Sequence, residues 1–88
     1  MKRINITNRF KKDLARCAKR GYGKEKFEEI LDLLERDLPL PAKCRPHVLV
    51  GDWAGHVECH IGPDWLLIYK NGDEEINLVA TGTHSDIF

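Results

Sequence analysis

The sequence predicts an α+β domain in which two N-terminal antiparallel helices pack on a twisted antiparallel sheet of about four to five strands. Two observations predict this class. Hydrophobic residues recur at helical spacing between Phe10 and Leu38, and after Pro46 they alternate with polar residues, as in strands. Helices followed by a run of strands are typical of domains whose helices cover one side of an antiparallel sheet. A chain of 88 residues suits a single domain, residues 1–88, with a small core.

The first half of the chain is predicted to hold a short strand and two helices. Residues 2–7 alternate as in a strand. Thr7 or Asn8 then caps a basic amphipathic helix that ends at Gly21. A second amphipathic helix follows and is stopped by Pro39. Because the connector between them is short, we expect the two helices to form an antiparallel hairpin.

The second half is predicted to form a meander of four strands, at residues 47–50, 56–61, 65–70 and 76–81. The third strand is almost entirely apolar, which predicts that it lies at the centre of the sheet. Asn71-Gly72 is the strongest hairpin signal in the chain. On the second strand, His56, Glu58 and His60 share one face, opposite an apolar face.

Charge is distributed unevenly, although the net charge is zero. Residues 1–26 contain ten lysines and arginines and two acidic residues, whereas residues 27–88 contain four and twelve. The basic part indicates contact with a polyanion such as nucleic acid, or else a solvated helix face that pairs with the acidic part.

The composition also predicts where the protein works. No apolar run is long enough to span a bilayer and the first residues are polar, so we expect no membrane segment and no secretion signal. Cys17, Cys44 and Cys59 are an odd number with no CxxC pair. A disulfide framework or zinc knuckle is therefore not expected, and the prediction is a reducing cytoplasm.

Four histidines and one acidic residue are the candidates for chemistry: His47, His56, His60, His84 and Asp64. Cleavage of RNA without a metal needs a base for the 2′-hydroxyl and an acid for the departing 5′-oxygen. Two histidines can fill both roles, because imidazole titrates near neutrality. A cation is also needed for the charge that develops on the phosphate. Each histidine taken alone equally fits an ordinary polar surface residue.

Other readings of these residues are weaker. Cys59 and His60 are adjacent and face opposite sides of a strand, which is poor geometry for a shared metal, so no metal is expected. Cys59 lies on the apolar face and is not expected to be a nucleophile. Trp53 and Trp65 equally fit core or edge packing, and Asp64 equally fits a turn residue.

Two C-terminal motifs resemble the YafQ branch of the RelE/ParE superfamily of type II toxins. They are CHIGPDWLLIYK at residues 59–70 and TGTHSDIF at residues 81–88. Other positions also fall where that branch has them, namely Leu38-Pro39-Leu40-Pro41, His47, Gly51, Trp53 and Gly55. The resemblance covers essentially the whole chain.

The resemblance implies a RelE-like fold, similar to microbial ribonucleases. It also implies a toxin that acts as a metal-independent endoribonuclease, cutting mRNA in the ribosomal A site by attack of the 2′-hydroxyl. Its partners would be the ribosome, mRNA and a DinJ- or RelB-like antitoxin of the ribbon-helix-helix type that silences it. The antitoxin would fold as it binds, and the complex would bind operator DNA through the antitoxin.

The resemblance also implies functional positions. These are His47, His60, Asp64 and His84 for catalysis, and Trp65 and Phe88 for substrate contact. His60 and His84 would be the leading proton-transfer pair, and Asp64 would orient or tune one of them. Which histidine is the base and which the acid does not follow from the sequence.

Val57 departs from the family pattern, because many relatives have arginine there. His56, Lys70 or the ribosomal RNA environment would supply the missing positive charge, and His56 and Lys70 are therefore expected substrate contacts. If none of them supplies it, this member is expected to cut more slowly. Two alternatives remain open. One is a catalytically weakened relative. The other is a ParE-like toxin that binds DNA gyrase, against which the histidine set argues.

Overall fold

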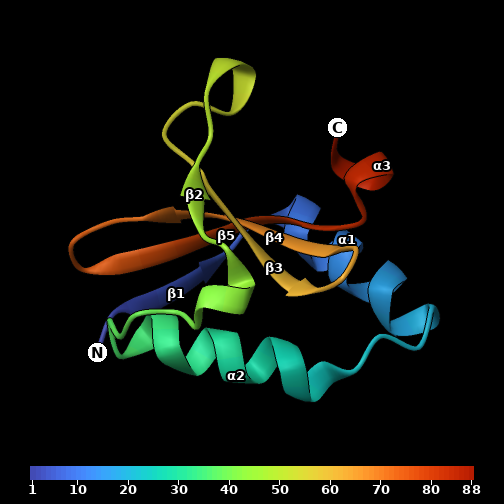
Figure 1. The fold of residues 1–88 in the computed structure, drawn as a ribbon, viewed down its shortest axis with the longest axis horizontal. Coiled ribbons are helices and arrows are strands. Elements are labelled where there is room, and N and C mark those ends of the chain that lie inside the picture. The colour runs from blue at the N-terminus through green and yellow to red at the C-terminus, as the bar shows by residue number, and fades with distance from the viewer.

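The computed structural model describes residues 1–88 and shows a five-stranded sheet with helices packed on one face (Figure 1). The elements in chain order are β1 (Arg3–Ile6), α1 (Asn8–Lys19), α2 (Lys24–Glu35), the 3-10 helix η1 (Ala42–Cys44), β2 (His47–Val48), the 3-10 helix η2 (Gly51–Trp53), β3 (Val57–Gly62), β4 (Trp65–Asn71), β5 (Glu75–Gly82) and α3 (His84–Ile87). The predicted α+β class is confirmed.

The strands are ordered β1-β5-β4-β3-β2 across the sheet. The pairs from β2 to β5 are antiparallel, but β1 runs parallel to β5, with Arg3 opposite Glu75 and Ile6 opposite Leu78. The predicted antiparallel sheet is therefore corrected at this edge. Alternation in sequence identifies a strand but carries no information about which neighbour it joins or in which direction.

β4 lies at the centre of the sheet, as its apolar sequence predicts. The predicted hairpin after it is also present, because Asn71 of β4 pairs with Ile76 of β5. The connection spans residues 72–74 and is closed by the Gly72 N–H, which donates to the Glu75 carbonyl at 2.9 Å. It is therefore longer than the two-residue turn that Asn-Gly favours.

The helix boundaries follow local chemistry. The Thr7 hydroxyl caps α1 by accepting from the Phe10 N–H at 3.1 Å, and the chain leaves the helix through Gly21, whose φ is +81°. α2 ends at Glu35, before the prolines, since Asp37 adopts a left-handed φ of +55° that a helix cannot continue. None of these helices has the length and apolar character that a bilayer crossing needs.

The two helices cover different parts of one sheet face. α1 lies against β5 and α2 against β3. They contact each other where the Phe10 and Phe27 rings meet, with centroids 5.8 Å apart. Both residues lie near the start of their helix, so the helices cross at an angle, whereas a hairpin would place the start of one beside the end of the other.

The hydrophobic core fills the space between these helices and the sheet. Its fully buried members include Phe10 from α1 and Leu67 and Leu78 from the central strands. Leu66 and Ile68 alternate with this set and point to the opposite face, yet they are also fully buried. Burial on both faces explains why β4 is an unbroken apolar run.

On the side away from β4, the end of β5 is held by side chains, because β1 stops opposite Leu78 and provides no ladder beyond it. Asp13 of α1, which is buried, accepts from the Thr81 N–H at 3.2 Å. The Thr81 hydroxyl donates to the Leu66 carbonyl at 2.6 Å and accepts from the Trp65 indole N–H at 2.9 Å. Thr81 thus joins α1, β4 and β5 at one buried point.

Replacing Thr81 by valine is expected to destabilise the fold. Thr81→Val keeps the shape but leaves a buried carbonyl and a buried indole N–H without partners, which costs about 1–3 kcal/mol. The free energy of unfolding in urea measures this loss. Thr81→Ser, which keeps the hydroxyl, is the matched control and should lose less. A valine variant as stable as the parent would contradict this account.

Candidate functional site

Two of the predicted histidines meet on the face of the sheet opposite the helices. On β3, Glu58 and His60 pair with Ile68 and Leu66 of β4, so both point to this face. α3 places His84 beside His60, with ring centroids 6.1 Å apart. The pair therefore comes from segments that the sequence separates by a complete hairpin.

Asp64, in the turn between β3 and β4, fixes His84. Its Oδ1 lies 3.0 Å from the His84 Nδ1 and 3.3 Å from the His84 backbone nitrogen. Both hydrogen bonds lower the pKa of Asp64 from its usual value, and the bond from the imidazole has the larger effect. Because an ionised carboxylate only accepts, the His84 Nδ1 carries a proton and its Nε2 is left to face a substrate.

Arg45 is a site residue that the sequence analysis missed. Its Nη2 lies 3.3 Å from the His60 Nε2. A guanidinium only donates, so the Nε2 must present a lone pair in this arrangement, while the buried Nδ1 has no partner. Arg45 adopts a left-handed φ of +44°, which is uncommon for a residue other than glycine. The available signal was its place two residues before His47.

Glu58 is the second residue that was missed. Its side chain is only 7% exposed, and its Oε1 lies 3.6 Å from the His47 Nε2. His47 is oriented in turn by its Nδ1, which lies 3.1 Å from the Arg45 carbonyl oxygen. The structure therefore places His47 at the edge of the cluster, linked to His60 through neighbours on β3. The alternation of β3 predicted the face of Glu58 but not a role.

The cluster has the donors that a metal ion needs. Ligand atoms of Glu58, His60 and His84 all lie within 4.8 Å of one another. Two imidazoles and a carboxylate suit transition metals such as copper or zinc. Cys59, the neighbour of His60 that was weighed as a ligand from the sequence, is not among these ligands. That thiol lies on the core face, and burial raises its pKa to about 12, which leaves it inert.

The structure places Trp65, the substrate contact that the resemblance implied, in the core. Its side chain is in the core, where its ring lies 5.1 Å from the Tyr22 ring. Its indole N–H donates to the Thr81 hydroxyl. A residue buried on the helix side offers no ring face to a base, so the structure assigns Trp65 to packing.

Lys70 and His56 also lie outside the histidine pair. Lys70 is at the far end of β4, where it lies against Gly55. The His56 Nδ1 is within hydrogen-bond distance of the Trp53 and Ala54 carbonyls, at 3.1 and 3.3 Å, and so holds the turn before β3. Arg45, by contrast, lies beside His60.

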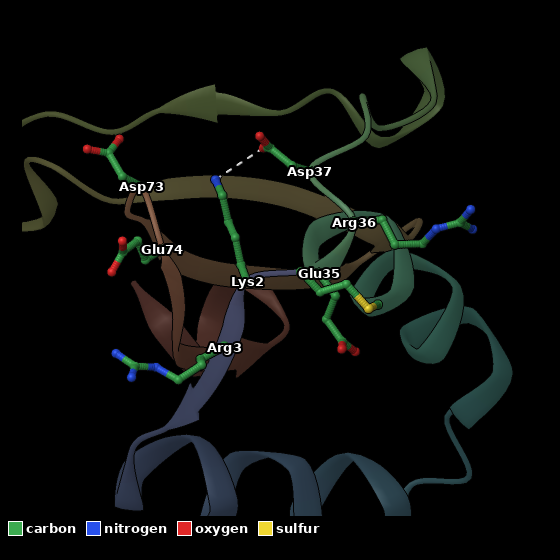
Figure 2. Close-up of a pocket in the computed structure, with 8 residues that line it drawn as sticks. Lys2, Arg3, Glu35, Arg36, Asp37, Asp73 and Glu74 are labelled. Atoms are coloured by element: carbon green, nitrogen blue, oxygen red, sulfur yellow. Dashed lines mark ion pairs between the residues drawn. The ribbon is translucent and has the colours of Figure 1, made fainter.

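Two hollows on the surface are candidates for a binding site, and they differ in the residues that line them. One of about 500 Å³ borders His60 and Arg45 and also includes Lys26 and Lys43. Another, of about 510 Å³, surrounds the N-terminus. Figure 2 shows acidic and basic side chains gathered around it, and Lys2 pairs with Asp37 at 3.1 Å. The hollow beside His60 is the stronger candidate, because it adjoins the histidine cluster.

α3 is held in place by Asp86. Arg20, the residue that caps the C-terminal end of α1, donates two hydrogen bonds to this carboxylate, at 2.5 and 3.1 Å. Asp86 also completes a capping box with Thr83, whose N–H donates to it at 2.8 Å. Gly82 is required here, because a Cβ would lie 2.7 Å from the Asp86 Oδ2 and its φ is +146°. These contacts fix the position of α3, whose first residue is His84.

Removing the Asp86 charge is expected to destabilise the fold in a pH-dependent way. The bonds from Arg20 and from the Thr83 backbone hold the pKa of Asp86 well below its usual range. A lowered carboxyl pKa stabilises the fold fully above its unfolded value, about 3.9, and the stabilisation fades as the pH falls through the folded value.

Asp86→Asn should therefore unfold more easily than the parent at neutral pH, and the difference should narrow below about pH 4. Thermal unfolding across this pH range is the measurement. Ser85→Ala, at an exposed neighbour, is the control. A difference that stays constant from neutral pH to strong acid would rule out the charged contact as its cause.

Comparisons with known proteins agree with this geometry. Residues 2–88 match the family described as bacterial toxin of type II toxin-antitoxin system, YafQ. The mRNA interferase toxin YafQ of Escherichia coli strain K12 is 37% identical over 86 residues, which are 97% of this chain and 94% of that protein.

Solved structures are similar over their full length. A copper-bound mutant toxin from Helicobacter pylori superposes with a TM-score of 0.95 at 33% identity and covers 100% of both chains. The toxin of the Escherichia coli DinJ-YafQ toxin-antitoxin complex gives 0.90 at 36% identity, over 99% of this chain and 97% of that one. From sequence and structure together, the chain belongs to the YafQ family of bacterial toxins of type II toxin–antitoxin systems.

Proposed function

We propose that this toxin is an endoribonuclease that cleaves mRNA by attack of the 2′-hydroxyl on the adjacent phosphate. The observation that carries the proposal is the histidine pair, in which His84 is held by Asp64 at 3.0 Å and lies beside His60. The name of the Escherichia coli relative, an mRNA interferase, supports the same activity. Neither the relatives nor the histidine cluster favours the gyrase-binding alternative.

The hydrogen bonds suggest how the two histidines divide the proton transfers. His60 presents a lone pair at Nε2, so it is suited to accept the proton of the 2′-hydroxyl. His84 has a carboxylate behind its Nδ1, which stabilises the imidazolium that donates from Nε2 to the departing 5′-oxygen. The arrangement of carboxylate, imidazole and reacting oxygen is the one that orients catalytic histidines in hydrolases.

Arg45 supplies the cation in this scheme. Its guanidinium touches His60 and borders the same hollow, so it can bind the non-bridging phosphate oxygens while the charge on them increases. When the phosphate draws Arg45 away, the His60 Nε2 is released for the 2′-hydroxyl. Arg45 thereby takes the part that relatives assign to the arginine at the position of Val57.

We also propose that the toxin acts on ribosome-bound mRNA and is silenced by a DinJ-like antitoxin. The complex of toxin and antitoxin would bind operator DNA through the antitoxin. The match to the toxin of the DinJ-YafQ complex supports the antitoxin. Exposed cations on one helix support contact with ribosomal RNA. They lie on α1 and include Lys11, Lys12 and Lys19.

Removing the imidazole of His84 should abolish most of the cleavage. His84→Ala is expected to slow the chemical step by about 10²–10⁴-fold, the usual contribution of a general acid. Single-turnover cleavage of mRNA on programmed ribosomes is the measurement. The parent rate should also follow a bell-shaped pH profile near neutrality. Cleavage by His84→Ala at the parent rate would remove His84 from the mechanism.

Three further variants sharpen this experiment. Arg45→Ala should lose about 10²–10³-fold, as when a charge-stabilising group is deleted, and Arg45→Lys should recover part of that rate. Lys70→Ala is the matched control: it deletes an exposed cation from the same sheet, away from the cluster, and should cleave like the parent.

We propose in addition that a transition metal binds Glu58, His60 and His84 and blocks the reaction, because it occupies the nitrogens that transfer protons. The distances among the three ligands support this site. The copper-bound relative supports the choice of metal.

Copper should therefore inhibit cleavage. Added Cu²⁺ is expected to reduce the rate, and the chelator EDTA should restore it, while EDTA alone leaves the rate unchanged because the chemistry needs no metal. Glu58→Gln removes one anionic ligand and should weaken copper binding, measured by calorimetry. Loss of cleavage on adding EDTA to the untreated protein would overturn the metal-independent scheme.

A further inference from the structure

We propose that Trp53 forms a base-stacking subsite for single-stranded RNA next to Phe88, whose contact with substrate the family resemblance already implies, and that Arg9 contacts the RNA backbone there. The inference rests on the proposed function and names the part of the surface that holds the substrate. The class of ligand is an unpaired nucleobase, recognised by its aromatic face and not by its hydrogen-bonding edge.

A row of rings leads away from the histidine pair. The His84 ring centroid lies 6.3 Å from that of Phe88, and the Phe88 centroid lies 6.0 Å from that of Trp53. The row ends at His56, whose ring packs against Trp53 at 5.5 Å. A nucleotide bound at His60 and His84 therefore has an aromatic surface next to it for the neighbouring base.

The subsite is built outside the core. The loop that carries η2 and the segment that carries α3 rise from the same side of the sheet (Figure 1). Phe88 is 56% exposed and Trp53 is half-buried. The two rings meet at 70°, so they form two walls of a corner. A planar base can stack on one wall while its edge contacts the other, as in proteins that bind unpaired RNA.

The two tryptophans differ in whether the indole N–H is already bonded within the protein. The indole N–H of Trp65 is bonded to Thr81, as expected for a buried tryptophan. Trp53 bonds to the protein through its backbone carbonyl, which lies 3.1 Å from the His56 Nδ1, and its indole N–H is left to donate to RNA. Trp65 is thus a core residue, whereas Trp53 keeps both a ring face and a donor for a ligand.

Arg9 adds charge to the subsite. Its guanidinium lies 5.4 Å from the Trp53 ring centroid, in a cation–π contact. Its Nε bonds to Asp13 at 3.4 Å, and its terminal nitrogens have no protein acceptor. A guanidinium held over one face of the Trp53 ring can reach the phosphate of a base that stacks on the remaining ring surface. This connects the basic face of α1 to the site.

The test uses short single-stranded RNA whose 2′-hydroxyls are methylated, so that it binds and cannot be cut. Binding should quench the fluorescence of Trp53 and not that of buried Trp65. Trp53→Leu keeps apolar packing but removes the ring, and should weaken binding about tenfold. Trp53→Phe keeps a ring and should stay close to the parent. Arg9→Gln should reduce the salt dependence of binding by about one phosphate contact.

A control variant and a kinetic measurement separate the loss of base stacking from a general disturbance of the loop. Val50→Ala changes an exposed residue of the same loop and should bind like the parent. Ribosomal cleavage by Trp53→Leu should show a raised KM with kcat much less affected. Binding by Trp53→Leu as tight as the parent's, or no quenching of Trp53, would overturn the inference.

The same experiments distinguish the subsite from the enzyme. If the parent cuts mRNA and Trp53→Leu cuts it with an unchanged KM, the subsite is wrong and the nuclease stands. If the parent binds the methylated RNA with quenching of Trp53 yet cuts nothing, the nuclease is wrong and the stacking subsite stands.

Discussion

The attachment of the C-terminal segment to α1 is the constraint on which the rest of the site depends. α1 holds this segment at two points: Asp13 accepts from the Thr81 N–H, and Arg20 donates to Asp86. The first contact ends β5 in a defined place, and the second fixes the short helix that follows. A helix of four residues has too few internal hydrogen bonds to persist alone. Without α1, His84 would belong to a free tail.

The opposite half of the site is fixed by the sheet. β3 sets the face of His60 and Glu58 through its alternation, and the turn before β4 delivers Asp64 to His84. Arg45 enters from the segment between η1 and β2 in a left-handed conformation, which costs free energy of order 1–3 kcal/mol. Rigid strands thus provide one imidazole, a tethered helix provides the other, and the strained arginine lies beside them.

The sequence predicts what depends on local pattern. Hydrophobic spacing is sufficient for the α+β class, for a central β4 and for the face of His60. It is not sufficient for the parallel edge strand, because pairing direction depends on long-range contacts. It also misses α3, although Thr83 and Asp86 have the spacing of a capping box. Arg45 was missed because its place beside His60 comes from an unusual backbone angle, and the burial of Trp65 was not predicted because a motif position does not state which face it occupies.

The parallel pairing of β1 with β5 has a consequence for synthesis of the toxin. It joins Arg3 to Glu75, nearly the two ends of the chain, so the first strand made must wait for the last. Contacts of such sequence separation form late in folding. α3 follows β5 in the chain, so His84 is made after every strand of the sheet. A growing chain therefore carries His60 without its partner, and the histidine pair can assemble only after α3 has been synthesised.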